Sequence, residues 1–249
     1  MYTATIQKFL AEHDYISVTP RAALIDMDGT LYDSMPSHAL AWQQLMGELG
    51  IDLPSKVFFR YEGRTGASTI DTIFRQKLGR PATEKEMTDL YKRKTEIFAS
   101  MPPVAPMPGA DRMLDFLESV SIKRVLVTGS GQSSLINRLS KDFPGAFNMD
   151  LRVTSRDVKH GKPSPEPYFK AMELADVKPN ECIVVENAPL GVEAGHASGA
   201  FTVGVNTGPL NPGELYESGA DIVFGSMEEF AEVLPLLVYG FITTSRNFN

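Results

Sequence analysis

Short apolar runs alternate with segments of helical periodicity in the second half of the chain. From Gly109 onward the candidate strands and helices are joined by short connections. The expected strands cover residues 123–128, 151–154, 182–185, 201–205 and 221–224, and the expected helices lie near 110–120, 132–140, 165–175, 190–198 and 226–238. This alternation predicts a mainly parallel sheet with helices on both faces.

The N-terminal part extends the same pattern. Ile6, Phe9 and Leu10 lie at helical spacing within residues 3–12, which predicts a short helix with a structural role. The continuous apolar run at residues 22–25 predicts a short buried strand. The fold class expected for this part of the chain and for the second half is therefore α/β, with a doubly wound, mainly parallel, Rossmann-like sheet.

An all-helical insert is expected between the first strand and the alternating region. Residues 33–104 contain several helical patterns and no convincing strand. One helix is predicted to begin near Pro36 and to end at Gly50. Another follows Thr83 and Glu86, a pair with the spacing of a capping box.

Two junctions connect this insert to the rest of the chain. Residues 33–36 form the entry, and residues 101–109 form a proline-rich exit that cannot continue a helix. We therefore expect a two-stranded hinge. It divides the chain into a Rossmann-like core at residues 1–32 and 105–249 and an all-helical cap domain at residues 33–104, called the core and the cap below.

Composition and charge narrow the classes of function. The 249 residues are 43% hydrophobic and 22% charged, as in ordinary globular proteins. The net charge of −7 argues against a nucleic-acid partner. The single cysteine, Cys182, lies in an apolar run and permits no disulfide framework, and no apolar run reaches the roughly 18 residues of a membrane helix. We expect a cytoplasmic monomer or weak dimer with no membrane partner.

Two carboxylates follow the first expected strand. Asp26 and Asp28 come directly after the run 22–25, and Gly29 with Thr30 ends it. Residues two apart in extended chain face the same way, so both carboxylates can address one small volume. Two carboxylates this close repel each other unless a cation lies between them or one of them is protonated, and either outcome is useful to an enzyme. An Asp-rich turn after a strand is the alternative interpretation.

A second strand end carries small and hydroxyl residues. Thr128, Gly129 and Ser130 follow the strand that begins at Lys123 and lead into an expected helix. Backbone amides at a helix N-terminus together with a hydroxyl can bind a phosphate group. An ordinary strand-to-helix turn would use the same residue types.

Two further strand ends offer a cation and oxygen ligands. Lys162 lies between Gly161 and Pro163 in a rigid loop, where it can neutralise charge on a transferring phosphoryl group. Glu186 and Asn187 follow another apolar run and offer the oxygen atoms that Mg²⁺ prefers. Ligands of parallel α/β sheets bind beyond the carboxyl ends of the strands, where all four segments are expected.

These four segments resemble, in order and spacing, the four motifs of the haloacid dehalogenase-like superfamily. The motifs are Asp26-Met-Asp28-Gly-Thr, Thr128-Gly-Ser, Gly161-Lys162-Pro and Glu186-Asn187. The resemblance covers roughly residues 20–238, and four ordered motifs are far more specific than one. The cap is similar to that of the β-phosphoglucomutase and phosphoglycolate phosphatase branch.

The resemblance implies a role for each motif. Asp26 would be the nucleophile that forms an aspartyl-phosphate, and Asp28 the general acid and then the general base, protonated when substrate binds. Thr128 and Lys162 would hold the phosphoryl oxygens. Asp26 would bind Mg²⁺ through its carboxylate and Asp28 through its backbone carbonyl. Because members that attack carbon lack the second aspartate, phosphoryl chemistry is favoured.

The fourth motif departs from the family pattern. It usually reads Glu-Asp, whereas Asn187 holds the second position here. An amide oxygen can bind Mg²⁺ but brings no charge, so we expect weaker metal affinity unless Glu186 compensates. The expected metal ligands are Asp26, Asp28, Glu186 and Asn187.

Several cap residues match the β-phosphoglucomutases. His38 and Trp42 have the spacing of that family's His-x-x-Ala-Trp, and Lys94 occupies the place of a cap lysine. A solvent-facing histidine, a tryptophan in the cap core and a solvated charge run at residues 92–94 are the alternatives. His38 and Lys94 are expected to bind substrate, together with Gly129 and Ser130.

One cap segment departs from that family. The pattern Lys-Gly-x-Ser-Arg appears here as Glu62-Gly63-Arg64-Thr65-Gly66, so both cationic positions for a second phosphate are changed. Arg64 is the remaining candidate for substrate binding. We therefore predict a Mg²⁺-dependent phosphatase for a small phosphorylated metabolite such as a sugar phosphate. A β-phosphoglucomutase or related hexose phosphomutase is the alternative, and a non-catalytic phospho-ligand sensor a third.

Overall fold

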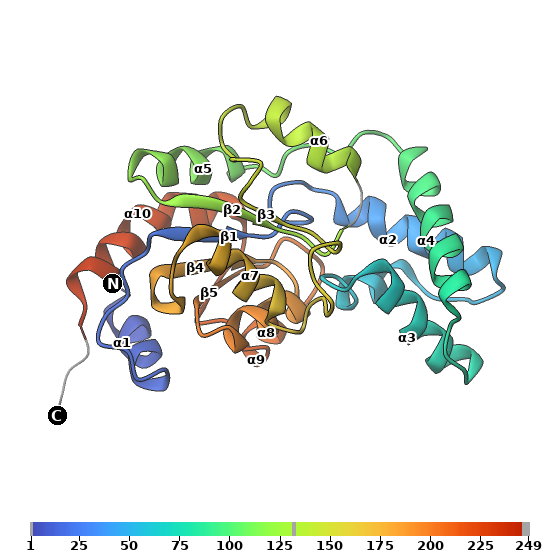
Figure 1. Cartoon of the computed structure of the whole chain (residues 1–249), viewed down its shortest axis with the longest axis horizontal. Helices are drawn as coiled ribbons and strands as arrows, with labels where there is room; N and C mark the ends of the chain where they lie inside the picture. Colours follow the sequence, from blue (N-terminus) through green and yellow to red (C-terminus); the bar gives the residue numbers. More distant parts are fainter. Residues whose placement is uncertain (1, 131–132, 246–249) are drawn as a thin grey trace.

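Six parallel strands form a single sheet in the core, in the order β3-β2-β1-β4-β5-β6 (Figure 1). The computed structural model describes residues 2–130 and 133–245. The strands are β1 (Ala22–Ile25), β2 (Lys123–Val127), β3 (Arg152–Val153), β4 (Cys182–Glu186), β5 (Phe201–Val205) and β6 (Ile222–Phe224). The order reverses between β1 and β4, and such a point in a parallel sheet opens a crevice at the carboxyl ends of the strands.

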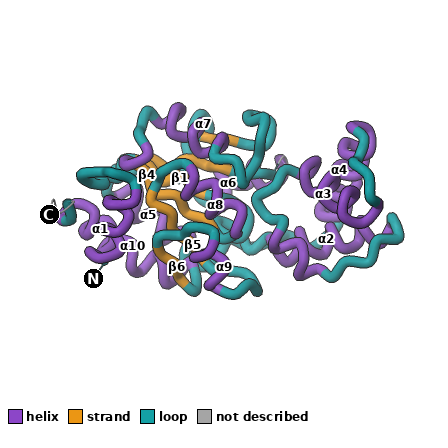
Figure 2. The backbone as a smooth tube through the Cα atoms, turned by 90° about the horizontal axis from the view of Figure 1, so that it is seen from below, coloured by secondary structure: helices purple, strands orange, loops and turns teal. Residues whose placement is uncertain are grey.

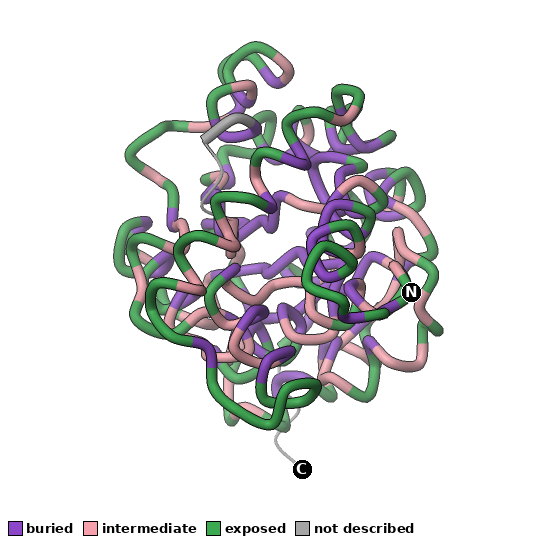
Figure 3. Tube along the Cα trace, turned by 90° about the vertical axis from the view of Figure 1, so that its right-hand side faces the viewer, coloured by how far each residue is buried: buried purple, intermediate pink, exposed green. Residues whose placement is uncertain are grey.

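Helices cover both faces of this sheet. They are α1 (Thr3–Glu12), α5 (Ala110–Ser119), α6 (Ser133–Asp142), α7 (Glu166–Ala175), α8 (Pro189–Ala197), α9 (Pro212–Glu217) and α10 (Met227–Thr243), with a 3₁₀ turn at Pro179–Glu181. Ala23 and Ile25 of β1 pack in one apolar cluster with α1, α5 and α10, while Ala22 and Leu24 pack in another with α7 and α8. Strands covered on both faces need continuous apolar runs, and buried positions accordingly gather in the interior (Figure 3).

The cap consists of helices at one end of the core (Figures 1 and 2). They are α2 (Met35–Glu48), a 3₁₀ helix (Ser55–Arg60), α3 (Gly66–Leu78) and α4 (Glu84–Ala99). The expected capping box begins α4, because the Thr83 hydroxyl accepts from the Glu86 backbone amide at 3.2 Å and the Glu86 carboxylate accepts from the Thr83 amide at 2.8 Å.

The two chain segments between core and cap are hydrogen-bonded to each other. The backbone amide of Asp33 donates to the carbonyl of Ala105 at 3.0 Å, and that of Met107 donates to Leu31 at 2.8 Å. An antiparallel bridge joins Tyr32 and Pro106 between these bonds. The entry and the exit therefore run as a pair.

The sheet and its flanking helices agree with the expected α/β class, and three details differ. Helices α3 and α9 are additional, and the second is only six residues long, begun by the Asn211 side chain that accepts from the Gly213 amide. Helix α10 continues past 238 to Thr243, and its Gly240 lies against Ile6 of α1. Residue 132, at the expected start of α6, and residues 246–249 lie outside the described residues.

None of the helices in the described ranges combines the length and apolar character needed to cross a membrane.

Candidate active site

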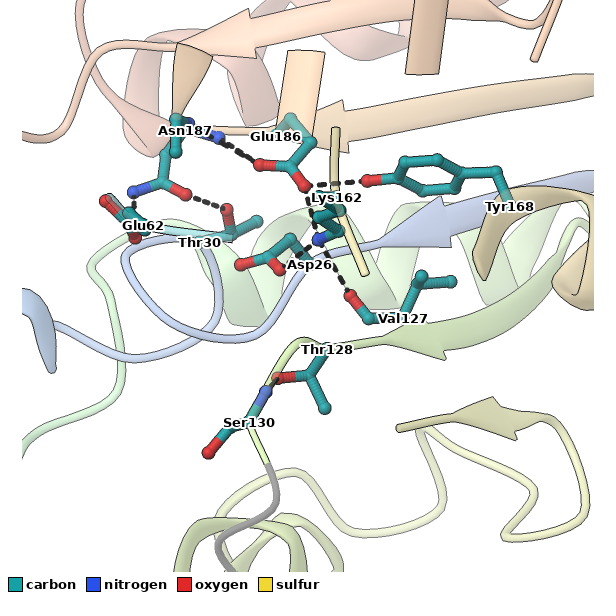
Figure 4. Close-up of polar contacts among 11 residues, drawn as sticks. Asp26, Thr30, Glu62, Val127, Thr128, Ser130, Lys162, Tyr168, Glu186 and Asn187 are labelled. Carbon is teal, nitrogen blue, oxygen red and sulfur yellow. Dashed lines mark hydrogen bonds and ion pairs between the residues drawn. The ribbon is translucent and has the colours of Figure 1, made fainter. Parts of the chain in front are cut away.

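Asp26 and Asn187 follow the two strands between which the strand order reverses. Asp26 extends β1, and its backbone amide donates to the carbonyl of Val185 on β4 at 3.0 Å. Asp26 is 4% exposed and Asn187 5% exposed. The crevice expected from the sheet topology therefore places these two side chains in one buried region (Figure 4).

Lys162 connects Asp26 to Glu186. Its ammonium group donates to Asp26 Oδ1 at 2.6 Å, to Glu186 Oε1 at 2.5 Å and to the carbonyl of Val127 at 3.2 Å (Figure 4). Burial alone would lower the pKa of Lys162, but the two carboxylates raise it above its usual value. Lys162 is thus a buried, charged ammonium group whose three donors all have acceptors.

Glu186 is bound on both oxygens by groups of the protein. Oε1 accepts from Lys162 and from the Tyr168 hydroxyl at 2.7 Å, and Oε2 accepts from the backbone amides of Asn187 at 3.1 Å and Ala188 at 3.5 Å. In the structure this carboxylate therefore contacts Lys162 and the N-terminal end of α8, and its role as a metal ligand stays a prediction. Tyr168, in α7, carries no signal in the sequence that would have marked it.

Asp28 faces the cap. Its Oδ1 accepts from the Ser34 hydroxyl at 2.6 Å and from His38 Nε2 at 2.9 Å. Lys94 donates to the other ring nitrogen, Nδ1, which assigns the proton of a neutral His38 to Nε2. Burial would raise the pKa of Asp28, but His38 and Ser34 lower it below its usual value.

His38 and Lys94 lie behind Asp28. Both are buried, and the Lys94 ammonium group lies 5.3 Å from the ring centre of Trp42 and 5.1 Å from that of Phe98. Both side chains also border the cavity between cap and core. The structure therefore brings the two predicted substrate residues together: His38 contacts Asp28 directly, and Lys94 contacts His38 on the opposite side of its ring.

The burial of Lys94 yields a prediction about stability. Desolvation lowers the pKa of Lys94 from 10.5 to about 7. Between these values the unfolded chain binds more protons than the folded protein, so the free energy of unfolding should rise with pH. We expect wild type to gain about 1 kcal/mol per pH unit from pH 7 upward relative to Lys94→Met, measured by urea unfolding. Lys92→Met, at an exposed position of the same helix, should track wild type, and parallel curves for wild type and Lys94→Met would contradict the prediction.

The predicted phosphate loop lies directly below the cap. The Thr128 hydroxyl accepts from the backbone amide of Ser130 at 3.0 Å, which holds the turn after β2 together. A Cβ atom on Gly129 would lie 2.6 Å from the carbonyl oxygen of Gly63 in the cap. The loop from the cap and the loop after β2 therefore touch at two glycines.

The cap segment around Glu62 closes the site. Glu62 Oε1 accepts from Asn187 Nδ2 at 2.8 Å, and Asn187 Oδ1 accepts from Thr30 at 3.4 Å (Figure 4). Sequence reasoning noted Glu62 only as a lost cation, because its contact with Asn187 depends on how the cap is placed on the core. The altered Gly66 is also constrained, since a Cβ there would lie 2.0 Å from the ring of Tyr91.

A cavity of about 70 Å³ lies between cap and core. Its walls combine aromatic and polar side chains: Asp28, Met35, His38, Trp42, Phe58, Tyr61, Glu62, Arg64, Gly66, Thr69, Tyr91, Lys94, Gly129 and Ser130. Arg64 donates to Ser68 at 3.2 Å, and its Nε is one of two buried side-chain polar atoms without a partner within the described ranges. Arg64, one of the predicted substrate-binding residues, thus has an N–H donor available for a ligand in the cavity.

The donor set at the carboxyl ends of β1 and β4 fits a hard divalent cation. Asp26 and Asn187 offer oxygen atoms. Gly29, with φ +82°, leaves space for the Asn187 side chain, because a Cβ at position 29 would lie 2.0 Å from Asn187 Nδ2. Burial raises the pKa of Asp26, and Lys162 only partly opposes this. No group of three His, Cys, Asp or Glu side chains in the described part of the chain is arranged to hold a metal, so a cation here would also need amide or backbone oxygens.

Comparisons with known proteins identify similar chains. A model of the haloacid dehalogenase-like hydrolase family matches residues 20–199. Hexitol phosphatase A of Escherichia coli is 30% identical over 207 residues, covering 83% of this chain and 91% of that protein. The β-phosphoglucomutase of Bacillus subtilis is 27% identical over 198 residues, covering 76% and 84%. The structure of a β-phosphoglucomutase-like protein from Bacteroides vulgatus superposes with a TM-score of 0.93 at 44% identity, covering 96% and 98%.

Proposed function

The chain belongs to the haloacid dehalogenase-like hydrolase family, and from this premise we propose that it is a Mg²⁺-dependent phosphatase of small sugar phosphates that acts through an aspartyl-phosphate. Sugar phosphatases and phosphomutases among its relatives support an enzyme of this general kind. They give no support to a non-catalytic sensor. The choice between phosphatase and mutase depends on the cap.

The observation that carries the proposal is the acidic cap residue Glu62. A mutase must bind a second phosphate group while the first is transferred, and this needs cations in the cap. Glu62 instead presents a carboxylate that is bonded to Asn187, and Gly66 has no room for a longer side chain beside Tyr91. A phosphatase needs no second phosphate site, and the remaining Arg64 can bind a sugar hydroxyl.

In the proposed reaction, Asp26 attacks phosphorus and the bond to the sugar oxygen breaks while Asp28 gives that oxygen a proton. Water then attacks the aspartyl-phosphate, Asp28 takes a proton from it, and inorganic phosphate and Asp26 are released. Lys162 and Thr128 hold phosphoryl oxygens, and the backbone amide of Gly129 adds a donor. The negative charge of the arriving phosphoryl group would raise the pKa of Asp28 and so give it the proton it must donate.

A bound Mg²⁺ ion would neutralise charge on Asp26 and on the transferring phosphoryl group. Asp26, the backbone carbonyl of Asp28 and Asn187 are the residues that would hold it. Glu186 would act through Lys162, whose position it fixes by an ion pair.

Substrate entry requires the cap to move. A cavity of about 70 Å³ is far below the roughly 300 Å³ at which small-molecule sites begin. The paired segments 32–35 and 101–108 are the proposed hinge, and closure after binding would exclude bulk water from the aspartyl-phosphate.

One assay separates the two candidate functions. We expect incubation with β-glucose 1-phosphate, Mg²⁺ and a trace of the sugar bisphosphate to release free phosphate and no glucose 6-phosphate. A screen of phosphate release over some tens of sugar phosphates would then identify the preferred substrate. Accumulation of glucose 6-phosphate would contradict the phosphatase and favour the mutase.

A further inference from the structure

We propose that Glu62 supplies, from the cap, the carboxylate that the fourth motif lacks at Asn187, so that Mg²⁺ binding is coupled to closure of the cap. This inference rests on the proposed function, because it concerns the metal of the same phosphoryl-transfer site. It assigns Glu62 a metal-binding role in place of the second-phosphate role that the corresponding cap position has in the similar mutases.

The contact between Glu62 and Asn187 lies where the fourth motif meets the first. Glu62 Oε1 lies 2.8 Å from Asn187 Nδ2 (Figure 4), and Gly29 of the first motif lies beside both side chains. A Cβ on Gly29 would lie 2.0 Å from Asn187 Nδ2 and 3.0 Å from Glu62 Oε1. The side chains of the cap and of β4 therefore reach the same space, directly beside the loop that carries Asp26 and Asp28.

The charges in this region leave Glu62 without a cation. Lys162 pairs with Asp26 and Glu186, and His38 lies against Asp28. Within the described residues Glu62 takes part in no ion pair, and its side-chain hydrogen bond is to a neutral amide. A half-buried carboxylate with only a neutral partner is stabilised by an added cation.

The two sequence departures complement each other. The resembled pattern combines a cationic cap residue with an acidic fourth motif, whereas this chain has an acidic cap residue and a neutral fourth motif. Relative to the resembled pattern, this chain carries the carboxylate in the cap, at Glu62, and not in the core, at position 187. An Asp at position 187 would face the Glu62 carboxylate at hydrogen-bond distance, a repulsion that the amide of Asn187 removes.

A ligand carried by a mobile cap links two equilibria. When the cap is open, Asp26, Asp28 and Asn187 remain and should bind Mg²⁺ weakly. Closure adds the Glu62 carboxylate and raises the affinity, and by reciprocity Mg²⁺ then favours the closed cap.

A second contact between cap and core provides a matched control. Arg60 of the cap donates to Glu214 of α9 at 3.1 and 3.4 Å, and this pair is exposed and borders no part of the cavity. Glu214→Gln therefore weakens a cap contact by the same chemical change as Glu62→Gln, without removing a carboxylate from the site.

The experiment measures Mg²⁺ binding by calorimetry and hydrogen exchange of residues 61–66 with and without Mg²⁺. We expect Glu62→Gln to raise the Kd for Mg²⁺ about tenfold or more and Asn187→Asp to lower it. The double variant Glu62→Gln/Asn187→Asp should return the Kd to within about threefold of wild type, but Mg²⁺ should no longer protect residues 61–66. Glu214→Gln should leave the Kd within about twofold of wild type.

Three results would overturn the inference: an unchanged Kd in Glu62→Gln, an equal rise in Glu214→Gln, or a double variant that binds Mg²⁺ no better than Glu62→Gln. Phosphate release is measured separately. Wild type that hydrolyses equally well in a chelator contradicts the proposed Mg²⁺-dependent phosphatase. Mg²⁺-dependent hydrolysis with an unchanged Kd in Glu62→Gln contradicts only the role of Glu62.

Discussion

Asp26→Asn should lower phosphate release by a factor on the order of 10⁴ or more, because an amide cannot attack phosphorus and no aspartyl-phosphate can form. The variant should still fold, since Asn can accept the hydrogen bond from Lys162. Release of inorganic phosphate at saturating substrate measures the effect, and mass spectrometry of acid-quenched wild type should detect one added phosphoryl group on Asp26.

The control is Asp52→Asn, the same chemical change at an exposed cap position, which should keep the activity of wild type. Hydrolysis by Asp26→Asn above about 1% of wild type would rule out Asp26 as the nucleophile, provided that the sample contains no wild-type protein.

Lys162→Met should lower the free energy of unfolding by about 3–5 kcal/mol as well as abolish activity. Removing this ammonium group leaves Asp26 and Glu186 as two buried carboxylates with no cation between them, and a broken buried ion pair is strongly destabilising. Urea unfolding measures the loss. Lys159→Met, at an exposed position of the same loop, should change stability by less than about 0.5 kcal/mol.

A second variant tests the cause of this loss. Lys162→Met combined with Glu186→Gln carries one buried negative charge fewer, so it should recover part of the lost stability. A fall of less than about 1 kcal/mol in Lys162→Met, or no recovery in the combined variant, would show that the buried charges are compensated by other means.

The residues at the strand ends could be found from the sequence because parallel strands bring their carboxyl ends to one edge. Asp26, Thr128 and Asn187 each lie at the end of an apolar run, and this local signal is enough to group them. Lys162 lies further from a strand and is marked instead by its neighbours Gly161 and Pro163. For Glu186, the role of metal ligand stays a prediction. Its carboxylate binds the backbone amides at the start of α8, and the Pro that opens that helix was the available signal.

Contacts between distant segments could not be found in this way. Glu62 meets Asn187 across 125 positions of the sequence, and Tyr168 reaches Glu186 from the first turn of α7. Neither residue interrupts a hydrophobic pattern or has a distinctive neighbour. Such contacts follow from the placement of the cap on the core and of α7 on the sheet, which periodicity does not encode.

The pairing of the two segments that connect cap and core should affect how reproducibly the cap returns to the same position on the core. A single tether would let the cap twist as well as tilt, whereas the hydrogen bonds from Asp33 to Ala105 and from Met107 to Leu31 hold two strands side by side. In the proposed hinge motion, this pairing should favour bending of the two segments as a unit over twisting. After each turnover the cap should return to the same alignment, so that Glu62 meets the same amide of Asn187 each time.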